Sequence, residues 1–202
     1  MESSEITAPC TYFRQTGPVN TPRTLELAGA RAEDLGIRQI LVATTRGVTG
    51  VQAVEMLRNR EVIVVTQSTG FRGPDVQLLT DENRAAIEAG GATILTAQHS
   101  FGGVGRAVRK KLGSYQVDEI MAYTLRTLGE GIKVVAELCL MAADAGLVRT
   151  DVPVIAVGGT GRGADTAAIL KPTNAQTFFD LRFLEIICMP APFHPALERE
   201  SN

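Results

Sequence analysis

The residues of this chain that could bind a ligand gather in four glycine-rich segments, each directly after a short apolar run. The first segment, residues 44–50, leads straight into a predicted helix, whose first-turn N–H groups lack intrahelical partners and favour an anion. Its candidate contacts are Thr44, Thr45, Arg46, Gly47, Thr49 and Gly50. We expect a phosphate group here, although the lysine of a P-loop is missing. The alternative is a tight glycine turn with exposed threonines.

The densest glycine cluster is residues 158–165. Gly159, Gly161 and Ala164 satisfy the G-x-G-x-x-[G/A] pattern of dinucleotide-binding proteins, but the following residues 165–170 are too few for a crossover helix. We therefore interpret the cluster as a flexible backbone cradle for a planar or phosphorylated ligand. Its candidate contacts are Gly158, Gly159, Thr160, Gly161 and Arg162. Arg162 and Asp165 are candidate catalytic residues; the alternative is a glycine turn across which they pair.

The other two segments, residues 67–75 and 97–106, combine hydroxyl, aromatic, glycine and arginine residues. Their candidate contacts are Ser68, Gly70, Phe71, His99 and Arg106. His99 could carry a proton or bind phosphate, or serve only as a hydrogen-bond donor. No Ser/His/Asp arrangement, pair of carboxylates or metal-ligand cluster accompanies it, so no metal is predicted and enzyme activity stays open.

Alternating apolar strands and amphipathic helices must position these segments. Continuous branched apolar runs predict buried strands at residues 39–43, 62–66, 92–96 and 153–157, and partial alternation predicts a longer edge strand at residues 177–188. Helical spacing and capping signals predict helices at residues 21–35, 49–58, 81–89, 117–127 and 130–145. This alternation predicts a three-layer α/β/α sandwich with a mostly parallel sheet, which brings the four segments to its carboxyl edge.

Composition excludes several classes of protein. The 202 residues are 45% hydrophobic, enough for a core, and predict a single domain at residues 1–202 with an N-terminal arm, residues 1–18, and a C-terminal tail, residues 190–202. A net charge of −2 predicts neither nucleic acid nor a membrane surface as partner. Three distant cysteines predict no disulfide framework or zinc site. Without a leader or a long apolar run, the chain is expected to be cytoplasmic.

Four stretches together resemble one known family, the uncharacterised prokaryotic proteins similar to the C-terminal α/β domain of pyruvate kinase. The stretches are residues 20–28, 42–50, 141–146 and 156–165, and the likeness extends from about Tyr12 to Pro190. The resemblance implies a mixed five-stranded sheet of order 3-2-1-4-5 with its last strand antiparallel. A pyruvate kinase also needs a catalytic barrel of about 250 residues, so this chain is not expected to be one.

The same resemblance suggests what the chain binds. In pyruvate kinase this domain has no catalytic residues and forms an allosteric sugar-phosphate site, whose phosphate loop corresponds to residues 44–50 here. Stand-alone members look like binders of flavin mononucleotide (FMN), with the ring near residues 158–165 or His99. We therefore expect a phosphorylated small molecule, FMN first. The proline-rich C-terminal tail, which either drapes over the domain or contacts another subunit, suggests a homo-oligomer. The alternatives are a flavin-dependent oxidoreductase or phosphotransferase using His99 and Arg162, and a regulatory sugar-phosphate sensor.

Overall fold

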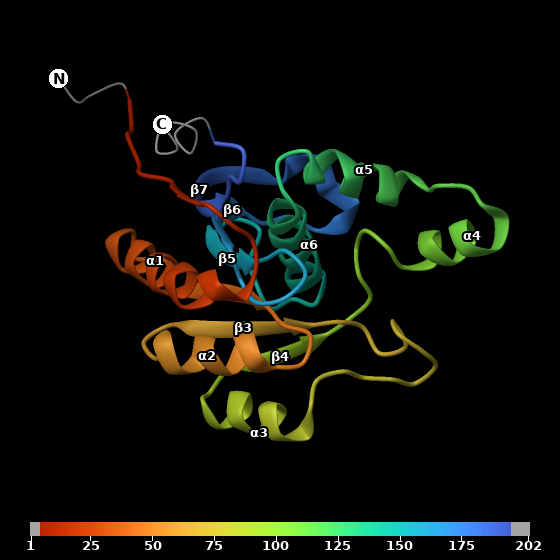
Figure 1. Cartoon of the computed structure of the whole chain (residues 1–202), viewed down its shortest axis with the longest axis horizontal. Helices are drawn as coiled ribbons and strands as arrows, with labels where there is room; N and C mark the ends of the chain where they lie inside the picture. Colours follow the sequence, from red (N-terminus) through yellow and green to blue (C-terminus); the bar gives the residue numbers. More distant parts are fainter. Residues whose placement is uncertain (1–4, 195–202) are drawn as a thin grey trace.

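The computed structural model describes residues 5–194 and contains a seven-stranded mixed sheet of order β1-β7-β6-β5-β2-β3-β4 (Figure 1). The strands are β1 (Thr11–Phe13), β2 (Gln39–Ala43), β3 (Glu61–Thr66), β4 (Thr93–Thr96), β5 (Val154–Gly158), β6 (Thr166–Lys171) and β7 (Arg182–Pro190). Strands β4, β3, β2 and β5 are parallel, so their carboxyl ends share one edge of the sheet. The antiparallel strand β6 joins β5 to β7.

Helices cover both faces of this sheet and make three layers (Figure 1). The helices are α1 (Thr21–Asp34), α2 (Val48–Met56), α3 (Asp81–Ala89), α4 (Val104–Leu112), α5 (Val117–Arg126) and α6 (Glu130–Asp144), with short 3-10 helices η1 (Pro18–Asn20) and η2 (Ala175–Asp180). One core packs α1, α2 and α3 against the sheet, and the other packs α6 against the opposite face. Helix α5 lies outside α6, which explains why α6 is buried almost all round.

Side-chain alternation along the strands separates the two cores. In β2, Ile40 and Val42 face the core of α1 and α2, whereas Leu41 faces the core of α6. All three are 0% exposed, as expected for a strand covered on both faces. The continuous apolar runs in the sequence therefore correspond to the central strands, and the predicted α/β/α fold class is confirmed.

The structure differs from the predicted sheet in its antiparallel part. Residues 166–171 form the unpredicted strand β6, which pairs with β5 directly after the glycine-rich loop. The predicted strand at 177–188 begins only at Arg182, because η2 occupies residues 175–180. Strand β7 is antiparallel to its neighbour β6 and therefore parallel to β5. The sheet has seven strands rather than five, and its order begins as predicted, β4-β3-β2-β5.

The N-terminal arm supplies the edge strand next to β7. Thr11, Tyr12 and Phe13 run parallel to residues 188–190, and Ala191 N–H donates to the Phe13 carbonyl. The predicted edge strand is therefore covered by the arm of the same chain. The expectation that the C-terminal tail either drapes over the domain or contacts another subunit falls mostly on residues 195–202, which lie outside the described residues.

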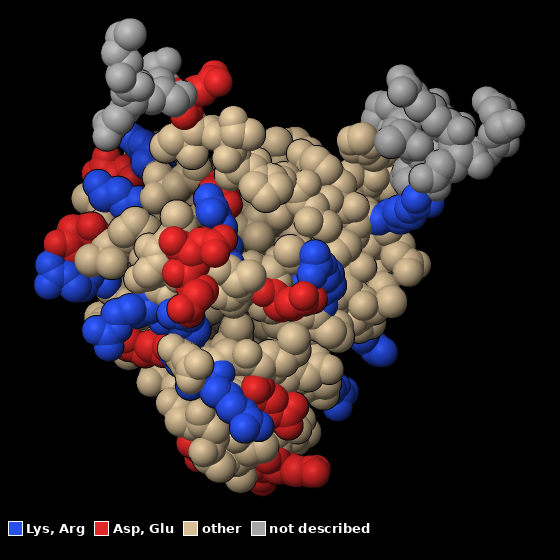
Figure 2. Space-filling model, turned by 90° about the vertical axis from the view of Figure 1, so that its left-hand side faces the viewer, with Lys and Arg blue, Asp and Glu red and all other residues tan. Residues whose placement is uncertain are grey.

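Charged side chains of both signs are mixed on the face seen in Figure 2, where Lys and Arg lie beside Asp and Glu. This mixing agrees with the near balance of 20 basic and 22 acidic residues. Within residues 5–194, no helix is long and apolar enough to cross a membrane.

Candidate functional site

A cleft of about 1210 Å³ lies where the loops after β2, β3, β4 and β5 meet the side of α6. The parallel strands end at this edge, so the arrangement matches the position of ligand sites in open α/β sheets. Eleven predicted residues line it: Thr44, Thr45, Arg46, Thr49, Phe71, His99, Arg106, Gly159, Thr160, Gly161 and Arg162. The fold therefore brings predicted residues from all four glycine-rich segments to one cavity.

The loop between β2 and α2 presents hydroxyl groups and the start of a helix to the cleft. Thr44 is 7% exposed, and its Oγ1 accepts a hydrogen bond from Gly47 N at 3.1 Å, which leaves the hydroxyl hydrogen available to a ligand. Thr49, also 7% exposed, lies in the first turn of α2 and lines the cleft. These groups could donate to an anion together with the free N–H groups of that turn.

The two glycines of this loop have a packing role. Gly47 has φ +102°, a conformation that favours glycine, and a Cβ there would collide with Asn83. A Cβ on Gly50 would lie 2.7 Å from a side-chain carbon of Ile87. Neither glycine lines the cleft, so both allow α2 to lie close to α3 and the sheet while the threonines and Arg46 face the cavity.

The loop between β5 and β6 is fastened by Asp165, which is 0% exposed. Its Oδ2 accepts hydrogen bonds from Gly17 N at 2.9 Å and Thr160 N at 3.2 Å, and its Oδ1 accepts one from Thr166 Oγ1. Asp165 does not line the cleft and forms no ion pair with Arg162, which stays exposed at the cavity rim. Its bonds hold the loop and the N-terminal arm together.

Two rings and an arginine form one wall of the cleft. The Phe71 and His99 rings are stacked with centroids 5.2 Å apart, and the Arg106 guanidinium lies 4.7 Å from the centre of the Phe71 ring. His99 Nε2 accepts a long hydrogen bond of 3.4 Å from Ser68 N, and its Nδ1 is 3.4 Å from Glu137 Oε2. Both ring nitrogens of His99 therefore face protein groups.

Sequence reasoning missed the ionic cluster that α6 adds to this wall. Lys133 and Glu137, each 5% exposed or less, form an ion pair one helical turn apart, and Phe101 N donates to Glu137 Oε1 at 3.0 Å. Burial opposes the charge of Glu137, but the hydrogen bond from His99 and the charge of Lys133 lower its pKa to about 2. The available signal was two charged residues, Lys133 and Glu137, within residues 131–143 of α6, whose other members are all apolar.

The cleft has an excess of positive charge. Six Lys or Arg residues and only two Glu residues line it. Arg126 and Lys133 pair with Glu130 and Glu137 respectively. Within residues 5–194, no ion pair involves the other four cations, which are Arg46, Arg72, Arg106 and Arg162. Four uncompensated guanidinium groups around one cavity favour an anionic ligand.

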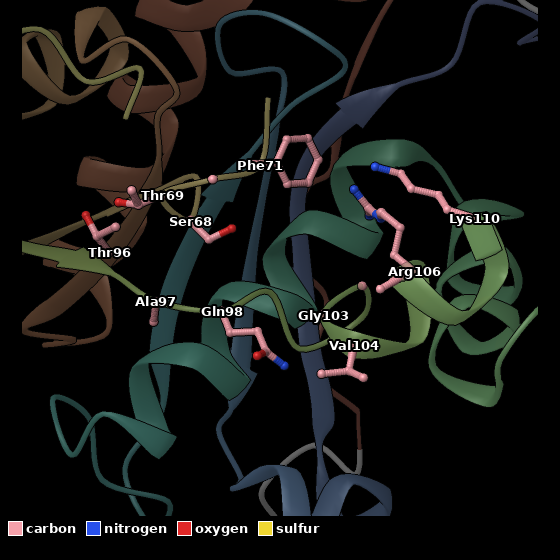
Figure 3. Close-up of a pocket in the computed structure, with 13 residues that line it drawn as sticks. Ser68, Thr69, Phe71, Thr96, Ala97, Gln98, Gly103, Val104, Arg106 and Lys110 are labelled. Atoms are coloured by element: carbon pink, nitrogen blue, oxygen red, sulfur yellow. The ribbon is translucent and has the colours of Figure 1, made fainter. Parts of the chain in front are cut away.

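A second cavity of about 580 Å³, here called the α4 pocket, lies beside the cleft (Figure 3). Its lining includes two residues that the sequence assigned to ligand contact, Ser68 and Gly70. Phe71 and Arg106 line both cavities and form their common wall. Gly47, Gly50, Gly158 and Asp165 line neither of them.

Comparison with known proteins identifies the family. The family model of the pyruvate kinase alpha/beta domain matches residues 23–171. Two solved structures of pyruvate kinase from Cryptosporidium parvum are similar at 13% and 14% identity, with TM-scores of 0.37 and 0.40. They match 76% and 77% of this chain but only 22% and 23% of their own length. Because the family model covers well over half of the 202 residues, the chain belongs to the pyruvate kinase alpha/beta domain family.

Proposed function

We propose that the cleft binds a phosphorylated small molecule with a planar ring, and that this ligand is FMN. The observation that carries the proposal is a set of four arginines that form no ion pair within residues 5–194. They surround a cavity of ligand size at the carboxyl edge of the sheet. Uncompensated charges of one sign in a cavity are stabilised when a ligand of opposite charge binds. A phosphate group supplies that charge.

The phosphate end of the ligand belongs beside α2. Thr44, Thr45 and Thr49 line the cleft there, and Arg46 precedes the helix. Hydroxyl donors, a guanidinium group and the first turn of a helix are the groups that hold a phosphate ester in proteins. Arg162 faces the same cavity from the opposite loop.

The ring end of the ligand belongs on the apolar side of the cleft. Val65, Leu78, Val134, Leu138 and Met141 line it. With the Phe71 and His99 rings they provide the apolar surface that a heteroaromatic ring system needs. The residues present thus fit FMN, which when bound supplies one- or two-electron redox chemistry. The chain's own groups would bind and orient it.

Titration with FMN, followed by quenching of flavin fluorescence, tests the proposal. The wild-type protein should bind FMN saturably, and Arg46→Gln should weaken binding by about five- to tenfold, because one charge-assisted contact is lost. Arg58→Gln is the matched control, since Arg58 follows the other end of α2 and does not line the cleft. Its affinity should equal that of the wild type.

Two results would contradict the proposal. One is a protein that purifies without colour and gives no saturable FMN binding. The other is equal loss of affinity in Arg46→Gln and Arg58→Gln, which would indicate a general charge effect. Mass spectrometry of any small molecule released from the purified protein identifies a different phosphorylated ligand if FMN fails.

The enzyme alternative is favoured by one contact, the one between His99 and Glu137 in the wall of the cleft. A carboxylate beside an imidazole holds the ring in one orientation. An oxidoreductase using His99 should, when loaded with FMN, oxidise NADH in air, with dioxygen as the acceptor of the two electrons that the flavin receives. His99→Ala should then abolish that reaction even when FMN saturates the variant, whereas a pure binding protein shows no turnover in either form.

A further inference from the structure

Two basic side chains of α4 line the α4 pocket. Arg106 and Lys110 lie one turn apart on the same face of α4 and line this pocket (Figure 3). Within residues 5–194, neither of them forms an ion pair, whereas Arg109 of the same helix pairs with Glu119 at 2.7 Å. Like charges at this spacing repel each other, so the arrangement is stabilised by a bound anion.

The backbone near Arg106 is shaped to hold its guanidinium group. A Cβ on Gly102 would lie 2.5 Å from a terminal nitrogen of Arg106, so the guanidinium group packs directly against the backbone of this loop. The Nε atom of Arg106 is buried and has no hydrogen-bond partner among the described residues. The guanidinium group therefore retains donor capacity beside Phe71.

Neutral donors complete the lining of the pocket. Ser68, Thr69 and Gln98 line it from the loops after β3 and β4, and Figure 3 shows their side chains on the side across from Arg106 and Lys110. A Cβ on Gly103 would collide with the Gln98 amide, so this glycine also makes room for a polar side chain. Hydroxyl and amide donors facing two cations form the donor set of a phosphate site.

We propose that the α4 pocket is a second anion site, which takes the phosphate group of a small molecule separate from the one proposed at α2. The pocket volume of about 580 Å³ lies within the usual range for small-molecule sites. The site shares Phe71 and Arg106 with the cleft, but none of its residues belongs to the loop between β2 and α2, so it can be tested without FMN. Its common wall with the cleft places a second phosphorylated molecule next to the first.

Inorganic phosphate is the probe, and backbone amide NMR of the full chain locates its binding. Phosphate is titrated at constant ionic strength, with sodium chloride as the non-specific control. The amides of Gly102, Gly103 and Arg106 should shift saturably. Lys110→Gln should raise the phosphate dissociation constant read at these amides by about fivefold. Lys111→Gln is the matched control, because Lys111 is the next exposed lysine of α4 and lines neither cavity.

The outcomes separate this site from the proposed FMN site. Arg46→Gln should leave the phosphate shifts at Gly102, Gly103 and Arg106 unchanged, while Lys110→Gln changes them. The proposal is overturned if these amides show no saturable shift, or if Lys111→Gln weakens binding as much as Lys110→Gln. Failure of FMN to bind leaves this test intact, since the probe is phosphate alone.

Discussion

At the scale of single residues, Glu137 links the chemistry of the cleft to the stability of the protein. Its carboxylate faces Lys133, His99 and the Phe101 N–H group, all inside the wall of the cleft. Burial alone would raise the pKa of Glu137, but the His99 hydrogen bond and the Lys133 charge lower it to about 2, from an ordinary value of 4.5. The charged form is therefore stabilised in the folded protein.

This shift predicts a specific loss of stability in acid. Because the folded-state pKa of Glu137 is lowered, its contribution is fully present above about pH 4.5 and is lost as pH falls toward 2. The contribution is about 3 kcal/mol, since one pKa unit corresponds to about 1.4 kcal/mol. Glu137→Gln should be less stable than wild type by about this amount at pH 7. Urea unfolding from pH 7 to pH 3 should show this difference shrinking below about pH 4.5.

The control for this prediction is Glu88→Gln, which removes an exposed carboxylate 3.8 Å from Arg84. Exposed ion pairs contribute little, so its stability should follow the wild type within about 0.5 kcal/mol at every pH. A Glu137→Gln difference that stays constant from pH 7 to pH 3 would show that the lost stability comes from packing and not from charge.

Residue patterns identified the loop residues of the cleft but not Lys133 and Glu137. Loop candidates carry a local signal, because glycine, threonine and arginine after a buried strand indicate a ligand edge. The ion pair of α6 faces the cleft only because α6 crosses the sheet at that place, a long-range relation that spacing in the sequence does not encode. The glycines show the converse: Gly47 and Gly50 were expected to approach a ligand, and they allow close packing instead.

At the scale of elements, the close approach of α6 to β6 depends on Gly131. A Cβ at this position would collide with the Thr166 side chain, and Thr166 is 0% exposed, so it has no room to move. Gly131→Ala should push α6 away from β6 and destabilise the protein by about 1–3 kcal/mol, the usual cost of overpacking. Thermal and urea unfolding measure this loss. FMN affinity should also fall, because Lys133 and Glu137 lie on the displaced helix.

Gly73→Ala is the control for this substitution. A Cβ on Gly73 would meet Val76 at 3.5 Å, an ordinary contact distance, and its φ lies outside the positive range. Its stability should match that of the wild type or rise slightly, because alanine restricts the unfolded chain. If Gly131→Ala is as stable as the wild type, α6 and β6 can move apart without cost, and the prediction is wrong.

The elements that the sequence predicted are those with a regular apolar period. Buried strands β2, β3 and β5 and helices α1 and α6 have this period and appear close to the predicted bounds. Strand β6 was missed because its run of small and branched residues directly follows a glycine-rich loop. Residues 165–170 are too few for a crossover helix, so they were interpreted as a short connection. Helix α4 was missed because it has no buried residue and begins within a segment interpreted as a loop.

At the scale of the whole molecule, exposed apolar side chains gather on α5, on the turn before it and at the last residue of α4. Leu112, Tyr115, Val117, Ile120 and Tyr123 are each more than half exposed. Val117, Ile120 and Tyr123 are spaced so that they lie on one side of α5. Clustered apolar surface of this kind marks contacts between proteins. We therefore propose this face as the contact between copies in the homo-oligomer that the sequence led us to expect.

Light scattering during size-exclusion chromatography tests this assembly. The wild-type protein should have a mass that is a multiple of 21.6 kDa, and Ile120→Lys should shift it toward a single chain, because a charge in an apolar contact loses its hydration. Val152→Lys is the control, since Val152 is exposed but lies outside this cluster, between α6 and β5. A wild-type mass of 21.6 kDa, or an Ile120→Lys variant that keeps the larger mass, contradicts the proposal. If Ile120→Lys dissociates and still binds FMN, each copy carries a complete cleft.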